Sequence, residues 1–491
     1  MKQNLKNNTA KFVYIILLLA VGINCIQQPK LIVVQVFAAI YLTVIFKCFS
    51  TTFRKNLYYA TLMFAIMGYA MMFHIGERYG IYYFYFTLFI YMVLLIFKEK
   101  CYIKVVDIVK NNKYARFLCI FIIYFLISII WTDDKKVAIM SSINYIIMIS
   151  LLLMVVMENN SRDKLRETFK FLEYVYLGIL VLGFVQILGF KYGLKNSYDV
   201  VPHIYEKLPY LKRVPQVFFY NPNNYGVVVT VAMIFIVVAY LFSNTKKQKL
   251  YYMVLFICSQ LNLIFSKCRT AWIILAMFMI FAIILSILYK SRNIRKSSTQ
   301  IFVVMVIIFF VLSLVPEMTY YYDKFNATPI LRKLNIVNIH KPAIPNNEIA
   351  SFGEKGSINV RYTLMIDVVN GVIKEKHLLG FGVGNTPTYI KKLGNTHEIF
   401  SIHSFWFEIL GDFGVFIFLY FIYICINIIK ELFINLKTKN DDLNRYSLTG
   451  ILSAISIAGL IFAPSSVVAF TPFWICLALI YSSLEVSKLE E

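Results

Sequence analysis

The chain has 491 residues, of which 59% are apolar, 17% aromatic and only 15% charged. A soluble fold of this composition would have too little polar surface to cover itself, so most of the chain is expected to face lipid. The net charge of +23 does not indicate a nucleic-acid partner, because the basic residues stand in short blocks between apolar runs and do not cover one face.

Apolar runs long enough to cross a bilayer recur along the whole chain. A hydrocarbon core about 30 Å thick needs roughly 20 apolar residues per helix. The first run has no small-residue cleavage site behind it, so we interpret it as a retained helix and not as a signal peptide. The pattern predicts an all-α, polytopic integral membrane protein with about 12–14 transmembrane helices. The candidate spans are 12–27, 31–49, 58–75, 80–97, 115–131, 137–157, 171–190, 224–243, 250–266, 271–289, 300–315, 403–428, 447–464 and 467–484.

The distribution of Lys and Arg predicts the orientation, because positively charged loops stay cytoplasmic. If the N-terminus is inside, 28 of the 49 basic residues fall in inner segments and six in short outer loops. The remaining fifteen lie in two longer outer loops, five in 191–223 and ten in 316–402. Long loops are partly exempt from the rule, so these charges are either translocated hydrophilic surface or contacts for an anion. We predict cytoplasmic N- and C-termini.

The spacing of the runs divides the chain into three parts. Residues 1–315 are expected to form a transmembrane bundle of about eleven helices, 316–402 a large extracytoplasmic loop, and 403–491 about three further helices. Within the loop, 361–380 carries apolar residues at helical spacing. They are Leu364, Val368, Val372 and Leu379. This spacing predicts a helix that lies on the outer membrane surface.

Five short sequences carry most of the functional information. They are FFYNPNNYG (218–226), FSKCRTAW (265–272), NVRYTLM (359–365), GFGVGNTPTYI (380–390) and HSFWFEILGDFGVFIF (403–418). In this order, and at the outer ends of the expected helices, they resemble the O-antigen ligase and Wzy-type polysaccharide polymerase family of bacterial envelope enzymes. The resemblance covers roughly 218 to 430, while the first seven helices resemble the family only in hydropathy.

The resemblance implies a GT-C-like, metal-independent, inverting glycosyltransferase without a cofactor. Such an enzyme moves a glycan from an undecaprenyl-diphosphate carrier to an acceptor hydroxyl, outside the cytoplasmic membrane of a bacterium. Its implied partners are the lipid-linked oligosaccharide, the bilayer, a chain-length regulator and a flippase. The chain must then supply a clamp for the diphosphate and a group that activates a hydroxyl.

Two arginines are the candidates for the clamp. A planar, permanently charged guanidinium suits bidentate phosphate recognition better than an ammonium does. Arg269 stands at an outer helix junction, where the alternative is an ordinary interfacial arginine with Lys267 as its solvated neighbour. Arg361 begins the expected surface helix, where the alternative is a solvated charge paired with Glu354 or Asp367. The resemblance implies the catalytic role for both arginines.

His403 is the candidate for activating the hydroxyl, because an imidazole near neutral pH can exist in either protonation state. It is expected in the first turn of the span that follows the large loop, where the alternative is a satisfied interfacial histidine. Glu408 lies five residues further on, about 140° around the helix, so the two are not expected to form a direct acid–base pair. Structural pairing and catalysis both remain open for Glu408.

The remaining predictions concern substrate binding. The residues expected to contact the diphosphate or the glycan are Lys267, Arg213, Asn224, Gly382, Gly384, Asn385 and Glu408. Asn224 is also expected to cap a helix. The glycine string at 380–384 is interpreted as a close backbone turn beside Arg361 and His403, because no βαβ pattern surrounds it. The histidines and cysteines show no metal-ligand spacing, so we predict no metal site.

Three functions remain in competition at this stage. We favour a polymerase of lipid-linked repeat units, of the kind that builds capsule, exopolysaccharide or O-antigen-like glycan. The alternative within the family is a ligase that transfers the glycan to lipid A core or to a wall polymer. A flippase of lipid-linked glycans is the alternative from another class, and it would carry charges along a central cavity. Here the charges gather at the outer ends of helices.

Overall fold

The computed structural model describes residues 2–49, 52–75, 79–97, 108–318, 320–322, 352–437, 444–464 and 468–488. Residues 323–351 of the predicted large loop therefore lie outside the described part.

Each of the predicted apolar runs corresponds to a helix of the structure. These helices are α1 (Lys2–Gln27), α2 (Ile32–Val44), α3 (Phe53–Met67), α4 (Tyr83–Phe97), α6 (Lys113–Ser128), α7 (Lys135–Glu158), α8 (Arg162–Ile187), α10 (Pro222–Leu241), α11 (Lys246–Phe265), α12 (Arg269–Leu288), α13 (Arg292–Ser313), α18 (Phe405–Ile434), α19 (Arg445–Leu460) and α20 (Thr471–Lys488). In the described part, seven helices are long and apolar enough to cross a membrane, by length and composition alone. The prediction of an all-helical, polytopic membrane protein is confirmed.

One short β-hairpin interrupts this pattern. Strands β1 (Met72–Ile75) and β2 (Tyr79–Tyr82) pair antiparallel, with Met72 opposite Tyr82. The expected helices at 58–75 and 80–97 are therefore too long at this junction. Helix α3 ends at Gly68, whose φ of +51° lies in the left-handed region that stops a helix.

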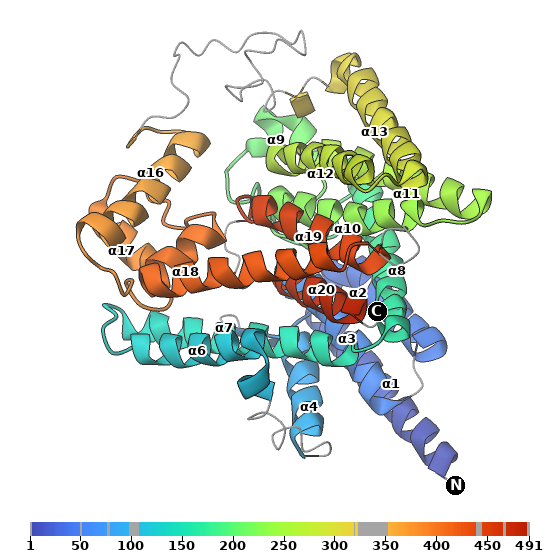
Figure 1. Ribbon diagram of the computed structural model, residues 1–491, viewed down its shortest axis with the longest axis horizontal. Helices are drawn as coiled ribbons and strands as arrows, with labels where there is room; N and C mark the ends of the chain where they lie inside the picture. Colours follow the sequence, from blue (N-terminus) through green and yellow to red (C-terminus); the bar gives the residue numbers. More distant parts are fainter. Residues whose placement is uncertain are drawn as a thin grey trace.

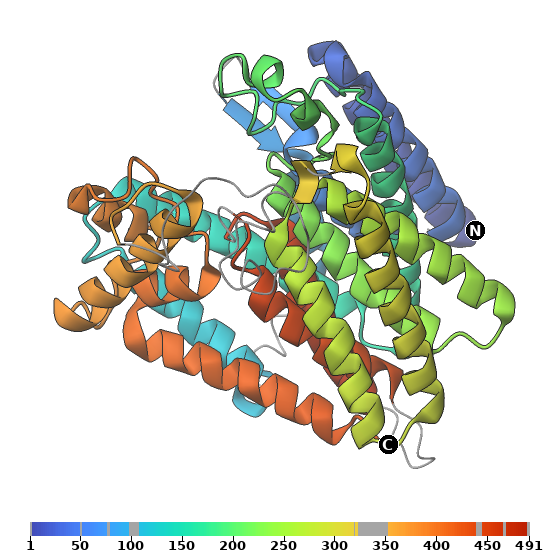
Figure 2. The ribbon, with the colours of Figure 1, turned by 90° about the horizontal axis from the view of Figure 1, so that it is seen from above.

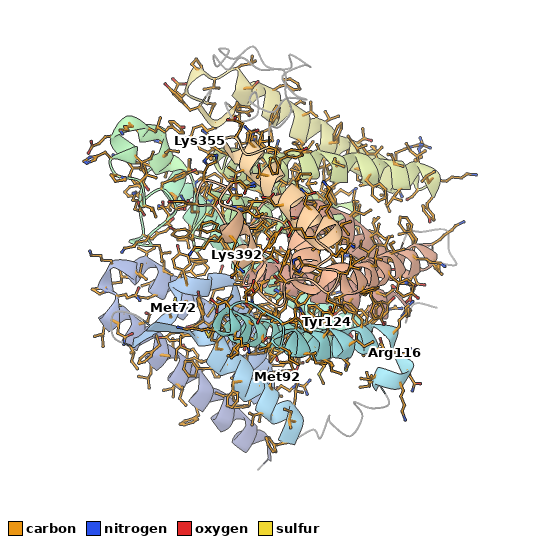
Figure 3. All side chains as sticks on the ribbon, turned by 90° about the vertical axis from the view of Figure 1, so that its left-hand side faces the viewer. Met72, Met92, Arg116, Tyr124, Lys355 and Lys392 are labelled. Carbon is orange, nitrogen blue, oxygen red and sulfur yellow. The ribbon has the colours of Figure 1, made fainter. Side chains whose placement is uncertain are left out.

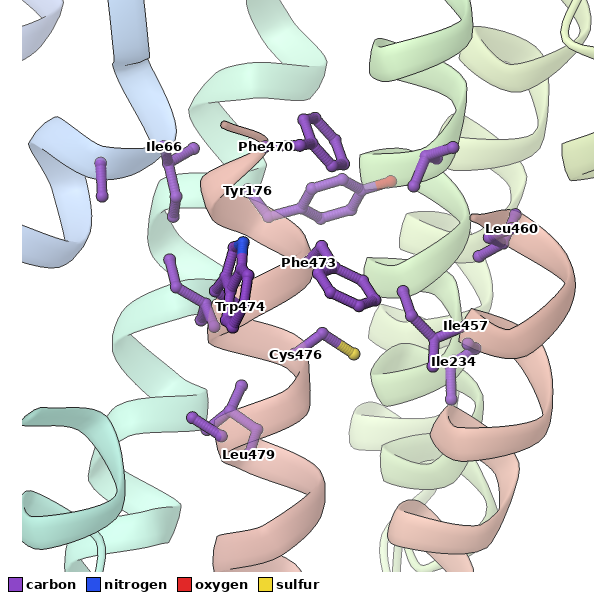
Figure 4. Packing of buried hydrophobic residues seen from close by; sticks show 14 of the residues in the cluster. Ile66, Tyr176, Ile234, Ile457, Leu460, Phe470, Phe473, Trp474, Cys476 and Leu479 are labelled. Atoms are coloured by element: carbon purple, nitrogen blue, oxygen red, sulfur yellow. The ribbon is translucent and has the colours of Figure 1, made fainter. Parts of the chain in front are cut away.

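Helix α20 lies in the centre of the bundle, between α7, α8 and α19. In Figure 4, Phe473 and Cys476 of α20 face Ile234 of α10 and Ile457 of α19. In the same view, the ring of Tyr176 of α8 lies between Phe470 and Phe473. Because these side chains are almost completely buried, α20 is a packed core helix for most of its length.

A small helical layer covers one end of the bundle. It contains α16 (Ser357–Val369), a π-helical turn (Asn370–Lys374) and α17 (Thr386–Leu393), which lie beside the start of α18 (Figure 1). Figure 3 looks from the side on which this layer lies and labels Lys392 of α17. The layer has its own apolar cluster, to which α18 contributes Leu410.

The surface helix differs from the prediction in three ways. It begins at Ser357, so Arg361 lies in its second turn. Leu364, Val368 and Val372 are fully buried, whereas Leu379 lies beyond the helix and is 51% exposed. The apolar face packs against α17 and α18, so this face is not free to lie on the membrane surface. Amphipathic spacing alone does not distinguish a helix that packs against other helices from one that lies on the membrane surface.

Helix α18 is broken at Gly414, whose φ and ψ of 72° and −172° are not helical. The segment 378–382 fills the break. Val415 N donates to Leu378 O (3.0 Å), and Phe381 N donates to Gly411 O (2.7 Å), so both ends of the missing helical bond find a partner. Non-helical backbone near a membrane is tolerated where it is covered by protein in this way.

Candidate active site

The structure brings Arg269, Arg361 and His403 together at the end of the bundle covered by α16 and α17. Arg269 is the first residue of α12, Arg361 belongs to α16, and His403 immediately precedes the N-cap of α18. The positive charge of Arg361 acts on both Arg269 and His403, so Arg361 lies within electrostatic range of each of them. Residues more than a hundred positions apart in the sequence thus share one site.

Arg361 is held by the turn that follows α19. Its Nη1 donates to the carbonyl oxygen of Phe462 at 3.2 Å. The alternative partner Asp367 is buried and hydrogen-bonded to Asn395 instead. Burial lowers the pKa of the Arg361 guanidinium, but an arginine keeps its charge in proteins. The result is a fixed, partly desolvated cation, which is what phosphate recognition requires.

His403 has one ring nitrogen in use and one available. A hydrogen bond joins the ring to the backbone of Pro464, where the ring N–H must donate because proline has only a carbonyl to offer. The other nitrogen, Nδ1, is buried and has no hydrogen-bond partner among the described residues. Burial and then the charge of Arg361 lower the pKa of His403 to about 4. The imidazole is therefore neutral at pH 7, with a free lone pair on Nδ1.

The position of His403 differs from the prediction. Helix α18 begins at Phe405 with Ser404 as its N-cap, so His403 lies before the helix and not in its first turn. Its φ of +55° is left-handed, a conformation that a residue other than glycine adopts only when its surroundings hold it. The Trp406 ring, whose Nε1 donates to Ala458 O at 3.0 Å, fixes the adjoining turn to α19.

The titration of His403 provides a test that does not depend on activity. We expect its imidazole to titrate near pH 4, and Arg361→Gln to move this pKa upward toward 6.5, because a positive neighbour disfavours the protonated ring. Hydrogen–deuterium exchange at imidazole C2, followed by mass spectrometry over a range of pH, measures it. Lys391→Ala, which removes an exposed cation of α17, should leave the pKa in place. An unchanged pKa in Arg361→Gln contradicts this electrostatic picture.

Lys267 is not the solvated neighbour of Arg269 that the sequence suggested as an alternative. It is only 4% exposed, and its Nζ donates to Tyr210 Oη at 3.3 Å while lying 4.3 Å from the centre of that ring. The centre of the Tyr321 ring lies 6.0 Å from the same Nζ atom. These contacts tie the α11–α12 turn to the segment 209–213 and give Lys267 a structural role. Arg213, at the end of that segment, is exposed, and its contact with substrate stays a prediction.

The N-terminus of α10 corrects the prediction for Asn224. The helix is capped by Asn221, whose Oδ1 accepts from Asn223 N at 2.8 Å. Asn224 lies inside the first turn, and its Oδ1 is buried without a hydrogen bond to any residue that the structure describes. Gly226 follows, and a Cβ there would lie 2.5 Å from Cys268 Cβ, so α10 approaches the turn before Arg269 closely.

The glycine string packs against protein and does not form an open cradle. Gly382 and Gly384 have φ of +88° and +70°, and a Cβ at either would lie about 2 Å from a side chain of the α6–α7 region. Gly384 N donates to Asp412 Oδ2 at 2.7 Å, and Asp134 N donates to Asn385 Oδ1 at 2.9 Å. Gly382, Gly384 and Asn385 are therefore structural, and their expected role in substrate binding has no support in this geometry.

Asp412 is the anchor of this loop. Its carboxylate accepts hydrogen bonds from Gly384 N, from Thr386 N at 3.1 Å and from Thr386 Oγ1 at 2.5 Å. A buried carboxylate with this many donors is satisfied and needs no substrate. Glu408, one turn earlier, and Asp412 both act electrostatically on the buried Tyr145. A catalytic role for Glu408 stays a prediction.

Two groups that hold the site in place could not be found from sequence patterns. The carbonyls of Phe462 and Pro464, in the turn after α19, bind Arg361 and His403. Any residue type can supply a backbone carbonyl, so no sequence pattern identifies these two groups. The one related feature of the sequence was Pro464, which ends an apolar run.

Part of the chain matches a known protein family. Residues 252–422 match the family model described as O-antigen ligase, a region that runs from α11 to α18 and contains Arg269, Arg361 and His403. Together with the helical fold, this match describes a multi-pass membrane protein, part of which is similar to the O-antigen ligase family.

The chain is 21% identical over 469 residues to the teichuronic acid biosynthesis protein TuaE of Bacillus subtilis (strain 168). The match covers 91% of this chain and 85% of that relative. No solved structure matches the chain. The family resemblance that the five short sequences carry is confirmed.

Proposed function

We propose that the chain is a glycosyltransferase that polymerises oligosaccharide repeat units carried on undecaprenyl diphosphate, outside the cytoplasmic membrane. The observation that carries the proposal is the meeting of Arg269, Arg361 and His403 at one end of the bundle. Two fixed cations beside a neutral imidazole suit a reaction in which a diphosphate leaves and a hydroxyl loses a proton. The relative's part in teichuronic acid biosynthesis supports a polysaccharide product.

In the proposed step, an oxygen of the acceptor hydroxyl attacks C1 of the sugar on the opposite side from the diphosphate. The new C–O bond forms as the C1–O bond to the diphosphate breaks, so the configuration at C1 inverts. The diphosphate leaves with the bonding electron pair, and Arg269 and Arg361 stabilise its added charge. The hydroxyl proton goes to Nδ1 of His403.

Binding of the donor would itself prepare His403 for this role. In the free protein, burial and Arg361 hold its pKa near 4, which makes it a weak base. A diphosphate beside Arg361 brings negative charge that offsets the guanidinium, and this raises the basicity of the ring. The base therefore becomes effective when the donor is present.

The charge distribution supports an extracytoplasmic position for this end of the bundle. The end of α11, the start of α12 and the start of α18 lie there, whereas the basic blocks such as 246–249 and 290–296 lie at the opposite ends of these helices. Basic loops stay in the cytoplasm. We accordingly propose that both termini are cytoplasmic.

A ligase is the second candidate, because the family model that matches the chain is described as O-antigen ligase. The proposed chemistry is identical in both cases. Only the acceptor differs, since a polymerase uses a second lipid-linked unit and a ligase uses a terminal acceptor such as lipid A core or a wall polymer.

Reconstitution in vesicles separates these functions. With a purified polyprenyl-diphosphate-linked repeat unit as the sole glycan, we expect a ladder of products that differ by one unit, since the same molecule serves as donor and acceptor. Gel electrophoresis after release of the glycan measures it, with protein-free vesicles as the control. Transfer only to an added lipid A core or wall-polymer acceptor would identify a ligase. Movement of intact units across the bilayer without any transfer would identify a flippase and refute the proposed function.

A further inference from the structure

An apolar groove of about 340 Å³ lies between α11, α12 and α13. Its walls include Leu263, Trp272, Ala276, Ile280, Phe302 and Phe310. Gln260 also lines the groove, and its Nε2 donates to Met305 O at 2.7 Å, so its amide ties α11 to α13. The groove thus offers hydrocarbon contacts along nearly all of its surface.

The groove begins about one helical turn after Arg269. On α12 its lining runs from Trp272 to Ile280, about 12 Å at 1.5 Å per residue. Residues 269, 273, 276 and 280 are spaced by three or four positions, so they form one stripe along the helix. Arg269 is therefore the first residue of the stripe that lines the groove. The C-terminal end of α11 and the C-terminal half of α13 supply the other walls at this same end of the bundle.

The groove opens toward the surroundings of the bundle. Met277 is 57% exposed and Ile280 is 47% exposed, although both belong to a helix apolar enough to cross the membrane. At this depth the neighbouring solvent is hydrocarbon, so the occupant must be an apolar chain that enters from the side. Figure 2 shows α12 and α13 side by side along one flank of the molecule, where none of the described helices covers them.

We propose that this groove holds the first isoprene units of the polyprenyl chain of the donor, whose diphosphate lies against Arg269. The inference rests on the proposed function, because that function supplies a lipid with an anionic head. The observation that supports the inference is that one stripe of α12 begins with a cation at the candidate site and continues as two turns of apolar wall. Ala276, the smallest residue of the stripe, leaves room in the middle for the methyl branches that distinguish an isoprenoid from a straight acyl chain.

Ile280→Trp tests the groove, and Ile284→Trp is its matched control. Ile284 is the same residue type one turn further along α12, is 44% exposed and does not line the groove. For a donor with a long polyprenyl chain, we expect Ile280→Trp to raise KM about tenfold at unchanged kcat, because uniform binding is lost. A donor with only two isoprene units should show no change, since it does not reach Ile280. Met277→Trp provides a second groove variant if Ile280→Trp does not accumulate in the membrane.

A photoreactive group on the third isoprene unit of undecaprenyl diphosphate provides an independent measurement. We expect it to crosslink to peptides of α12 and α13, and Ile280→Trp to reduce that crosslinking. Equal KM values for the groove variants and Ile284→Trp, or crosslinks confined to other helices, overturn the groove while the proposed function stands. Recovery of a phospholipid on α12 and α13 in place of the carrier overturns it as well. A parent protein that extends neither donor refutes the proposed function itself.

Discussion

Arg361→Ala is expected to reduce the rate of glycan transfer by about 10²–10³-fold, the usual effect of removing one preorganised donor from a developing negative charge. The guanidinium is half-buried and oriented by Phe462 O, so water would not replace it with the same geometry. Arg269→Ala should have an effect of the same order, because we propose that both cations hold one diphosphate, and Arg361 acts electrostatically on Arg269. Chain length in reconstituted vesicles, as a function of time, measures both.

Conservative variants separate charge from shape at this site. Arg361→Lys should recover part of the lost rate, because an ammonium restores the charge but not the bidentate geometry. Lys391→Ala on α17 removes a cation of the same layer that is exposed to solvent, and it should keep the rate of the parent. If Arg361→Ala and Lys391→Ala lose activity equally, the arginines do not hold the diphosphate and general surface charge matters instead.

Gly380→Ala is expected to prevent accumulation of folded protein. A Cβ at this position would lie 2.5 Å from Gly414 N and 2.6 Å from Asp412 O, both of which are backbone atoms in the break of α18. Backbone there has no room to move, because Val415 N and Gly411 O are already bonded to the same loop. The φ of +78° adds strain of about 1–2 kcal/mol for an alanine. Membrane levels and thermal unfolding of a fluorescent fusion measure the outcome.

Gly394→Ala is the matched control for this prediction. Gly394 also has a left-handed φ, +68°, but no described atom lies within 4 Å of the Cβ that an alanine would add, so only the conformational strain applies. The substitution should lower the melting temperature slightly and leave a folded protein. Similar losses in both variants would mean that the close approach of the loop to α18 contributes little.

The helical framework could be predicted because its signal is local. An apolar run of about 20 residues is sufficient to predict a helix in a membrane protein, and every predicted run from α1 to α20 forms a helix. The hairpin at 72–82 and the break at Gly414 could not be predicted in this way. The break interrupts a sequence that remains apolar, and it depends on contacts with another segment, because 378–382 takes over the hydrogen bonds of α18.

The candidate site could be predicted only in part. Arg269, Arg361 and His403 stood out because polar side chains at helix ends are few in an apolar chain, and the order of the surrounding sequences resembled a family. The sequence of the glycine string does not distinguish a left-handed turn beside a substrate from one that packs against a helix. The buried state of Lys267 depends on tyrosines 57 and 54 positions away, which no local pattern reveals.

The break in helix α18 also affects how far a tilt of its membrane-embedded part displaces the candidate site. An unbroken helix 30 residues long would behave as a stiff rod and carry any tilt of its membrane-embedded part directly to its tip. Because the helical hydrogen bond at Gly414 is missing, the first part of α18, which follows His403, is bonded to 378–382. The longer second part packs against α6. Changes in bilayer thickness should therefore be absorbed at the joint, and the spacing of the imidazole from Arg361 should persist across lipids of different chain length.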